Sequence, residues 1–179
     1  MPIPAGLCDE SAEPCCLSLS DIANHLLLSV FDALKACCET GCEGLSVYVA
    51  MGPGDDGIKD ALTVNPTLVT ASAGTRPGAP GLYRASFDVR LRESGWPTAY
   101  VDGTVIQLPE PALQAAASRY ILGRGEAMHR KLASMASSRG LTPPGVRCAN
   151  GSIGPLTPIT PQGGVVGWLV TVTVDLPWG

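Results

Sequence analysis

The chain has 179 residues and a formal net charge of −4. This length suits one domain with a buried core, so we expect a single domain over residues 1–179 in which residues 1–17 form an irregular N-terminal arm. The acidic balance lacks the basic excess that marks nucleic-acid-binding proteins. Only 16% of the residues are charged, which suits a subunit buried in an assembly, although Gly- and Pro-rich surface loops would give the same value.

The start of the chain carries no recognisable targeting signal. Residues 1–17 lack the basic region and the sustained apolar run of a secretory signal. The run Leu26-Leu27-Leu28 belongs to a segment with too few apolar residues to span a bilayer. We therefore expect the protein to be made in a cytoplasm and kept there or packaged from it.

Two segments have the spacing of amphipathic helices. Ser18 and Asp21 are arranged as in a capping box, and the helix after them is expected to end near Glu39. A second helix is expected to begin near Pro111, because proline is tolerated in the first turn, and to end near Ser138.

Two glycines interrupt the second helical pattern, at Gly123 and Gly125. Each costs about 1 kcal/mol relative to alanine inside a helix. We therefore expect a kink or a break there as one alternative to a continuous helix. The stretch around Arg124 lacks the third glycine and the preceding strand of a dinucleotide-binding motif, so it predicts no nucleotide site.

Alternation of apolar and polar residues predicts strands. The strict alternation over residues 82–92 is the strongest, residues 166–175 form the second strong strand, and residues 45–49 form a short one. The segment before the turn at residues 161–164 is expected to pair with the last strand as a hairpin. The order helix, strands, helix, hairpin predicts an α+β domain: a mostly antiparallel sheet of about four to five strands, two helices packed on one face, and a C-terminal β-hairpin.

The cysteines suggest two alternatives without favouring either. There are seven of them, an odd number, and no export signal, so a disulfide framework is not the default. Several lie before and after the first helix, which leaves a zinc site and a disulfide between the arm and the helix end as alternatives. No Cys-x-x-Cys pair is present, and Cys38 also fits the apolar stripe of the helix, so we expect no metal site.

No residues have the spacing of a known catalytic centre. His25 and His129 are the two histidines, one in each predicted helix, and Gly-x-Ser-x-Gly is absent. The acids within residues 52–57 lack the alternating ligand spacing of a calcium loop. We therefore expect a protein that is not an enzyme, with no catalytic residue, no cofactor and no metal.

Candidate contact residues lie on one strand face and in two loops. The polar face of the strand at residues 82–92 is either a solvated surface or a polar subunit interface, and the loops hold apolar residues that are expected to be exposed and to become buried on assembly. An equal alternative for Trp96 is that it folds back onto its own core. The predicted interface residues are Arg84, Asp88, Arg90, Trp96, Tyr100, Leu156 and Ile159.

The order of elements and several local patterns together cover most of the chain. The patterns are ACCETGCEG at residues 36–44, the strand LSVYV at 45–49, the alternating strand at 83–91, the Ala-rich helix start at 111–117, and PQGGVVGW at 161–168 leading into VTVTV at 170–174. In these stretches the chain resembles tail terminator proteins of long-tailed, non-contractile bacteriophages, especially those of actinobacterial hosts. The two glycines of the second helix and the long arm before Ser18 depart from that pattern.

The resemblance implies a structural, non-enzymatic role. Such proteins form a six-fold ring that caps the tail tube, ends its polymerisation and offers a surface to head completion proteins, while DNA passes through the ring without sequence reading. The expected partners are further copies of this chain in a homohexamer, the tail tube protein and a head completion or connector protein, with no membrane partner. The expected location is the neck of the virion, after assembly in the host cytoplasm.

Two alternatives stand beside this expectation. One is a head-completion or connector component of the same neck, which differs from a terminator in the partner that it binds. The other is a cysteine-based metal or redox module, which predicts bound zinc or a thiol pair that titrates.

Overall fold

The computed structural model describes residues 19–37, 42–50, 58–72, 81–94, 100–101, 104–105, 110–146, 148–162 and 165–178. Within these residues the chain forms two helices, α1 (Leu19–Cys37) and α2 (Pro111–Ser137). The strands are β1 (Ser46–Val49), β2 (Ala61–Ser72), β3 (Gly81–Glu93), β4 (Tyr100–Val101), β5 (Thr104–Val105), β6 (Asn150–Ile153), β7 (Thr157–Gln162) and β8 (Val165–Trp178).

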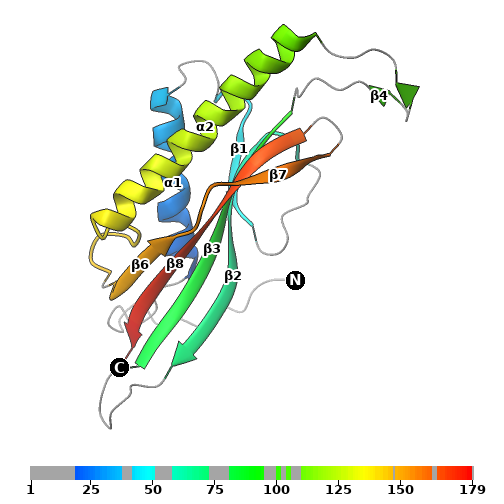
Figure 1. The fold of residues 1–179 in the computed structure, drawn as a ribbon. Helices are drawn as coiled ribbons and strands as arrows, with labels where there is room; N and C mark the ends of the chain where they lie inside the picture. Colours follow the sequence, from blue (N-terminus) through cyan, green and yellow to red (C-terminus); the bar gives the residue numbers. More distant parts are fainter. Residues whose placement is uncertain are drawn as a thin grey trace.

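Six of these strands form one sheet (Figure 1). Its order is β1-β2-β3-β8, and β6 and β7 both pair with the remaining edge of β8. Every pair is antiparallel except β1 with β2, which is parallel. The α+β class, the mostly antiparallel sheet and the C-terminal hairpin of β7 and β8 are confirmed, and the sheet has six strands where four to five were expected.

Alternate residues of the central strands form one apolar face. On β3, Phe87, Val89 and Leu91 are fully buried, and Phe87 lies opposite the fully buried Val172 of β8. Both helices contribute to the hydrophobic cluster on this face, with Leu26 and Leu34 among the residues of α1, and Met128 and Leu132 among those of α2. The two helices therefore cover the same face of the sheet, and α2 crosses α1 (Figure 1).

The second helix is continuous. It begins at Pro111, as predicted, and passes through Gly123 and Gly125 to end at Ser137. The alternative of a break at the glycines is therefore wrong. The first helix ends at Cys37, while Ser18 of the predicted capping box and residues 38–41 lie outside the described part of the chain.

At one end of the molecule helix α2 extends beyond the sheet, and at the other end strand β2 extends beyond its neighbour β1. The start of α2 reaches past the sheet (Figure 1), and residues 110–116 are all exposed. At the other end β2 continues well beyond β1, because β1 pairs only with residues 61–64. The described part of the molecule is therefore elongated, with different elements at its two ends.

Candidate functional site

The face of the sheet opposite the helices carries polar side chains that pair between β3 and β8. Arg84 lies opposite Asp175 and donates two hydrogen bonds to its carboxylate, from Nε to Oδ1 at 2.8 Å and from Nη2 to Oδ2 at 3.1 Å. One step along, Ser86 lies opposite Thr173, with 3.3 Å between the two hydroxyl oxygens. Because direct cross-strand neighbours stabilise a sheet, this pairing fixes the polar face within the subunit.

The same pairing continues toward the middle of the strands. Thr171 lies opposite Asp88 and donates from Oγ1 to its Oδ1 at 2.9 Å, while Arg90 donates from Nη2 to the other carboxylate oxygen at 3.0 Å. We call this set the polar ladder; it comprises Arg84, Ser86, Asp88 and Arg90 of β3 with Thr171, Thr173 and Asp175 of β8. The structure therefore brings three of the predicted interface residues, Arg84, Asp88 and Arg90, together on one face.

The charges of the polar ladder compensate one another inside the subunit. Hydrogen bonds from Arg84 hold the pKa of Asp175 below its ordinary value, and the same contact raises the pKa of the Arg84 guanidinium. The favoured state is therefore the charged pair. A partner that docked on this face would meet side chains that already have hydrogen-bond partners.

The other four predicted interface residues lie outside strands β3 and β8 in the sequence. Trp96 lies outside the described residues, and Tyr100 is described only as part of the backbone of the short strand β4. The expectation that Leu156 and Ile159 are exposed is wrong, because both are half-buried and Leu156 packs against the hydrophobic core. Leu156 is therefore partly committed to the fold of its own subunit.

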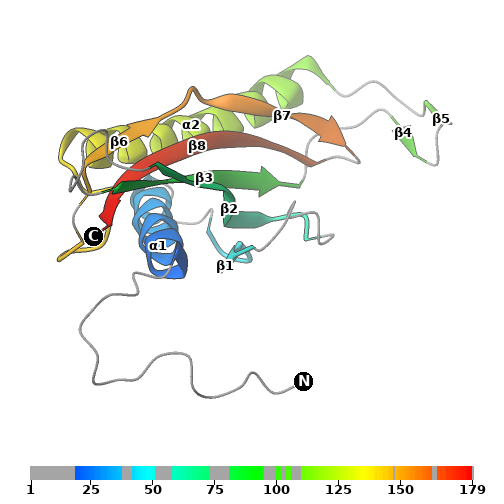
Figure 2. The same ribbon diagram turned by 90° about the horizontal axis from the view of Figure 1, so that it is seen from below.

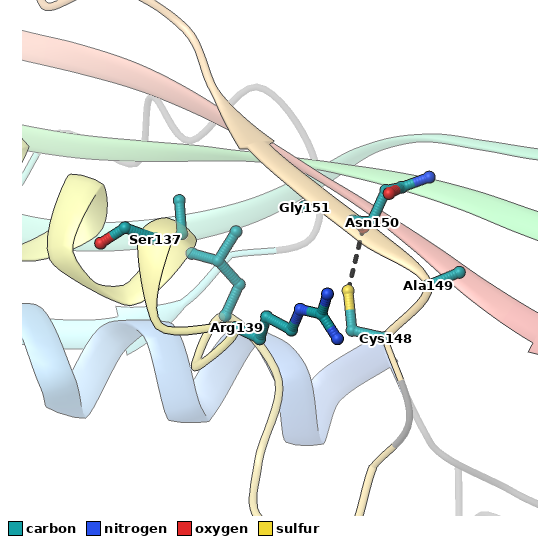
Figure 3. A pocket seen from close by; sticks show the side chains of 8 residues that line it. Ser137, Arg139, Cys148, Ala149, Asn150 and Gly151 are labelled. Atoms are coloured by element: carbon teal, nitrogen blue, oxygen red, sulfur yellow. Dashed lines mark hydrogen bonds between the residues drawn. The ribbon is translucent and has the colours of Figure 1, made fainter.

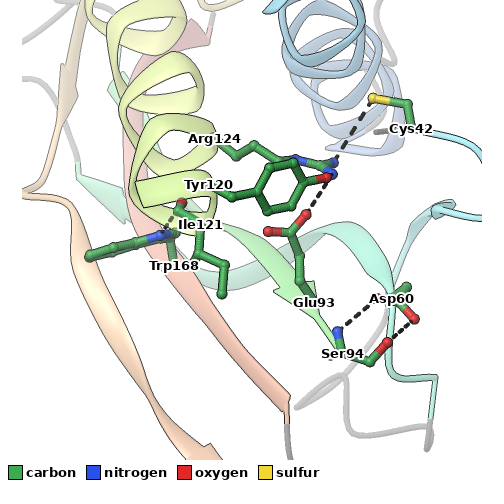
Figure 4. A network of polar contacts seen from close by, with 8 residues as sticks. All are labelled: Cys42, Asp60, Glu93, Ser94, Tyr120, Ile121, Arg124 and Trp168. Atoms are coloured by element: carbon green, nitrogen blue, oxygen red, sulfur yellow. Dashed lines mark hydrogen bonds and ion pairs between the residues drawn. The ribbon is translucent and has the colours of Figure 1, made fainter. Parts of the chain in front are cut away.

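A buried ion pair connects α2 to the end of β3 (Figure 4). Nη1 of Arg124 lies 2.6 Å from Oε1 of Glu93, and the two side chains are only 2% and 7% exposed. Glu93 follows Leu91 on the apolar face of β3, where it pairs in register with Val166. The sheet therefore places a carboxylate where the apolar stripe meets α2, and the helix supplies the opposite charge.

Further groups contact the guanidinium of this ion pair (Figure 4). Nη1 of Arg124 also donates to the Tyr120 hydroxyl, one helical turn earlier, at 2.7 Å, and Nη2 lies 3.9 Å from the sulfur of Cys42. The guanidinium carbon is 5.5 Å from the centre of the Tyr120 ring, within the range of a cation–π contact. Arg124 thereby joins α2, β3 and the segment before β1.

Burial and charge oppose each other at Glu93. Burial raises the pKa of this carboxyl, the Arg124 guanidinium lowers it and the nearby Asp60 carboxylate raises it, with a raised pKa as the net result. The pKa of Arg124 is raised by Glu93 against the effect of its own burial. Asp60 in turn accepts hydrogen bonds from the backbone N–H of Ser94 at 2.7 Å and from its hydroxyl at 2.5 Å, which holds the end of β3 against the start of β2.

A tryptophan explains the glycine beside Arg124. The indole Nε1 of Trp168 donates to the carbonyl of Ile121 at 2.8 Å, which brings the ring against α2 (Figure 4). A Cβ at Gly125 would lie 2.5 Å from Cδ1 of that ring, whereas a Cβ at Gly123 would meet nothing within 4 Å. Gly125 is therefore needed for a close approach between helix and sheet, and this role differs from the helix break that the sequence suggested.

One pocket lies where α2 ends beside β6 (Figure 3). It has a volume of about 170 Å³ and is lined in part by Arg139, Leu141, Cys148 and Asn150. The Cys148 thiol donates to the carbonyl of Asn150 at 2.9 Å, and burial raises its pKa, so the neutral thiol is favoured over the reactive thiolate. The pocket therefore presents no activated nucleophile.

The described cysteines, Cys37, Cys42 and Cys148, carry free thiols. The remaining four, including Cys15, Cys16 and Cys38, lie outside the described residues, so the arm-to-helix disulfide stays one of the open alternatives. Within the residues that the structure describes, no three His, Cys, Asp or Glu side chains are grouped as a metal site would require.

Comparison with known proteins adds no family to these observations. A scan against models of known protein families and a search of curated proteins both found no match. Neither described helix is long and apolar enough to cross a membrane.

Proposed function

We propose that this protein is a structural virion subunit that forms a closed homohexameric ring at the end of a bacteriophage tail tube. The ring ends polymerisation of the tube and joins it to a head completion or connector protein. The tail context comes from the resemblance of residues 36–49, 83–91, 111–117 and 161–174 to tail terminator proteins. The fold supports the assembly role through the surfaces that it leaves uncovered.

The observation that carries the proposal is that exposed apolar side chains gather at two distant places, while others, such as Leu28 of α1, are exposed singly. At the far end of β2 and the start of β3, Leu68, Val69 and Tyr83 are 52%, 47% and 40% exposed. On α2, Leu113 and Tyr120 lie two turns apart on the same side of the helix and are 57% and 45% exposed. Exposed apolar groups of this kind mark surfaces that become buried on association.

Two different surfaces are what a ring of identical subunits requires. A head-to-tail contact joins one surface of a subunit to another surface of its neighbour, and such contacts form a ring when the rotation closes. The elongated subunit presents its two surfaces at opposite ends, near the start of α2 and at the end of β2 (Figure 1). This arrangement supports a head-to-tail ring over a two-fold dimer.

The charge distribution suits a ring through which DNA moves. A strongly basic lumen would bind the DNA phosphates and release their counterions, and this binding would slow the passage of the DNA. The protein has a net charge of −4, and the arginines Arg84 and Arg90 of the polar ladder contact Asp175 and Asp88 of the same subunit. A polar ladder that faced the lumen would offer DNA little uncompensated positive charge.

Negative-stain electron microscopy of the purified protein, alone and mixed with tail tubes, tests the proposal. The expected result is a ring of six subunits and a matching cap on tube ends. A chain that stays strictly monomeric and never joins a tube end would contradict it. Binding to head connector complexes but not to tubes would make the protein a connector component of the neck instead.

A further inference from the structure

Part of strand β2 has an open edge. Strand β1 pairs with residues 61–64 of β2, whereas β3 pairs with β2 along its whole length up to Ser72. Within the described residues, no strand pairs with the outer side of residues 67–72, which we call the open edge. Figure 1 shows this part of β2 at the margin of the sheet, beyond the end of β1.

The backbone register identifies the groups that point outward from the open edge. The carbonyl of Val64 accepts from Ala50 on the β1 side, so even-numbered residues of this part of β2 point toward β1. The register skips Thr67, because Pro66 lies opposite Phe87 and Leu68 lies opposite Ser86. An extra residue reverses the alternation, so beyond it the odd-numbered Val69 and Ala71 direct their N–H and C=O groups away from β3.

The open edge lacks the features that normally prevent edge pairing. Residues 67–72 read TLVTAS, with no charge and no proline, and Thr67 to Ala71 are all exposed. The opposite margin of the sheet is different, because β7 contains Pro158 and Pro161. Proline and charge are the usual means by which an edge strand is protected, so the open edge is suited to accept another strand.

The other end of the subunit holds two short strands that lie outside the six-stranded sheet. Among the described residues, β4 and β5 pair with each other alone, over two residues each. Figure 2 shows them at the end of the molecule where α2 begins, far from the sheet. An isolated two-stranded hairpin is marginally stable in water and gains stability from a third strand.

We propose that the hairpin of β4 and β5 in one copy of this chain adds as a further strand to the open edge of the next copy. The backbone N–H and C=O groups of Val69 and Ala71 would form hydrogen bonds with the added strand. The side chain of Leu68, the neighbouring residue on β2, would pack against that strand. Donor and acceptor lie at opposite ends of one subunit, so the contact is head-to-tail. The proposal rests on the proposed ring and names the surfaces that close it.

A matched pair of substitutions tests the open edge in the full-length protein. Leu68→Lys places a charge on the edge, while Leu28→Lys makes the same change on α1 at a leucine that is 58% exposed. Mass photometry over a concentration series is expected to show that Leu68→Lys weakens association by about tenfold or more, with Leu28→Lys matching the wild type. Thr70→Lys gives a second edge variant, and thermal melts confirm that each variant folds.

Mixing distinguishes this contact from other forms of association. A second variant replaces residues 100–105 with a Gly-Ser segment of equal length, which removes the hairpin but leaves the open edge intact. Each variant alone is expected to be monomeric. Together they form a one-to-one dimer, because Leu68→Lys still offers a hairpin to the intact edge of its partner, and the dimer grows no further.

Three results would overturn the inference. They are a wild-type chain that stays monomeric, edge and hairpin variants that assemble as the wild type does, and a mixture of folded variants that yields no dimer. Its failure is distinguishable from failure of the proposed function. Rings that persist in both variants and still cap tubes contradict the inference alone, whereas rings that need both elements but never bind tubes contradict the function alone.

Discussion

Arg124 and Glu93 form an ion pair of 2.6 Å in which both side chains are almost fully buried, and this pair joins the middle of α2 to the last residue of β3. Removing charges from water costs several kcal/mol for each ion, and only close geometry with further hydrogen bonds compensates for that cost. Tyr120 and Cys42 add contacts to the guanidinium. The pair therefore specifies how the helix sits on the sheet, and its two members depend on each other.

Arg124→Ala should lower the free energy of unfolding by about 3–5 kcal/mol, because it leaves the Glu93 carboxylate buried without its partner. Chemical denaturation measures the loss. Arg119→Ala, at an exposed position of the same helix, is the control and should change stability by less than about 0.5 kcal/mol. The double change Arg124→Met with Glu93→Leu should lower the free energy of unfolding much less than Arg124→Ala, because it leaves no buried charge without a partner. Equal losses for Arg124→Ala and Arg119→Ala would show that the pair contributes nothing.

The two glycines of α2 should respond in opposite directions to alanine. Gly125→Ala forces a methyl group into the ring of Trp168 and should destabilise the protein by about 1–3 kcal/mol. Gly123→Ala meets open space and should stabilise it by about 0.5–1 kcal/mol, because alanine is the better helix former. Thermal melts of the two variants side by side give the comparison. Destabilisation by both would mean that the helix needs flexibility at Gly123 as well.

Acid should weaken the contribution that Asp175 makes to the stability of the folded protein. Its folded pKa lies below the unfolded value because Arg84 donates to its carboxylate, so the stabilisation is present above the ordinary aspartate pKa of about 3.9 and is lost as the pH falls through the folded value. The wild type should therefore be more stable than Asp175→Asn near neutral pH, and this difference should shrink as the pH falls below the ordinary aspartate pKa of about 3.9. Arg84→Met should reduce the pH dependence of the difference. A difference that stays constant over the whole range would contradict the pairing.

The assignment of the strand faces has its own test. Phe87→Ala removes a fully buried ring beneath the helices and should cost about 3–5 kcal/mol. Arg90→Ala changes the opposite face and should cost far less, since its contact with Asp88 lies on the polar ladder. Urea denaturation compares the two variants. A loss on Arg90→Ala as large as that on Phe87→Ala would mean that the faces are reversed.

The local patterns of the sequence predicted the fold better than they predicted its specific contacts. The alternation around Phe87 identified the buried face of β3, since a period of two assigns faces without knowledge of partners. The same alternation, continued by one step, puts Glu93 on the buried face, and Arg124 lies four residues before the buried Met128. Their meeting depends on how α2 crosses the sheet, so neither position alone revealed an ion pair.

Other features depend on distant partners and left no local signal. Gly125 looked like a helix break because its reason is the ring of Trp168, far along the chain. Leu156 looked exposed because it lies in a Pro- and Gly-rich segment, yet it packs on the core. The open edge of β2 follows from where β1 stops, which is a property of strand pairing and not of the residues 67–72 themselves.

The length distribution of tail tubes assembled in the presence of this protein tests the central claim most directly. Tube protein is polymerised with increasing amounts of the purified chain, and tube lengths and ends are recorded by electron microscopy. A terminator should shorten the tubes in proportion to its concentration and leave a six-fold cap on one end of each. Tubes of unchanged length with bare ends, in the presence of folded protein, would contradict the account.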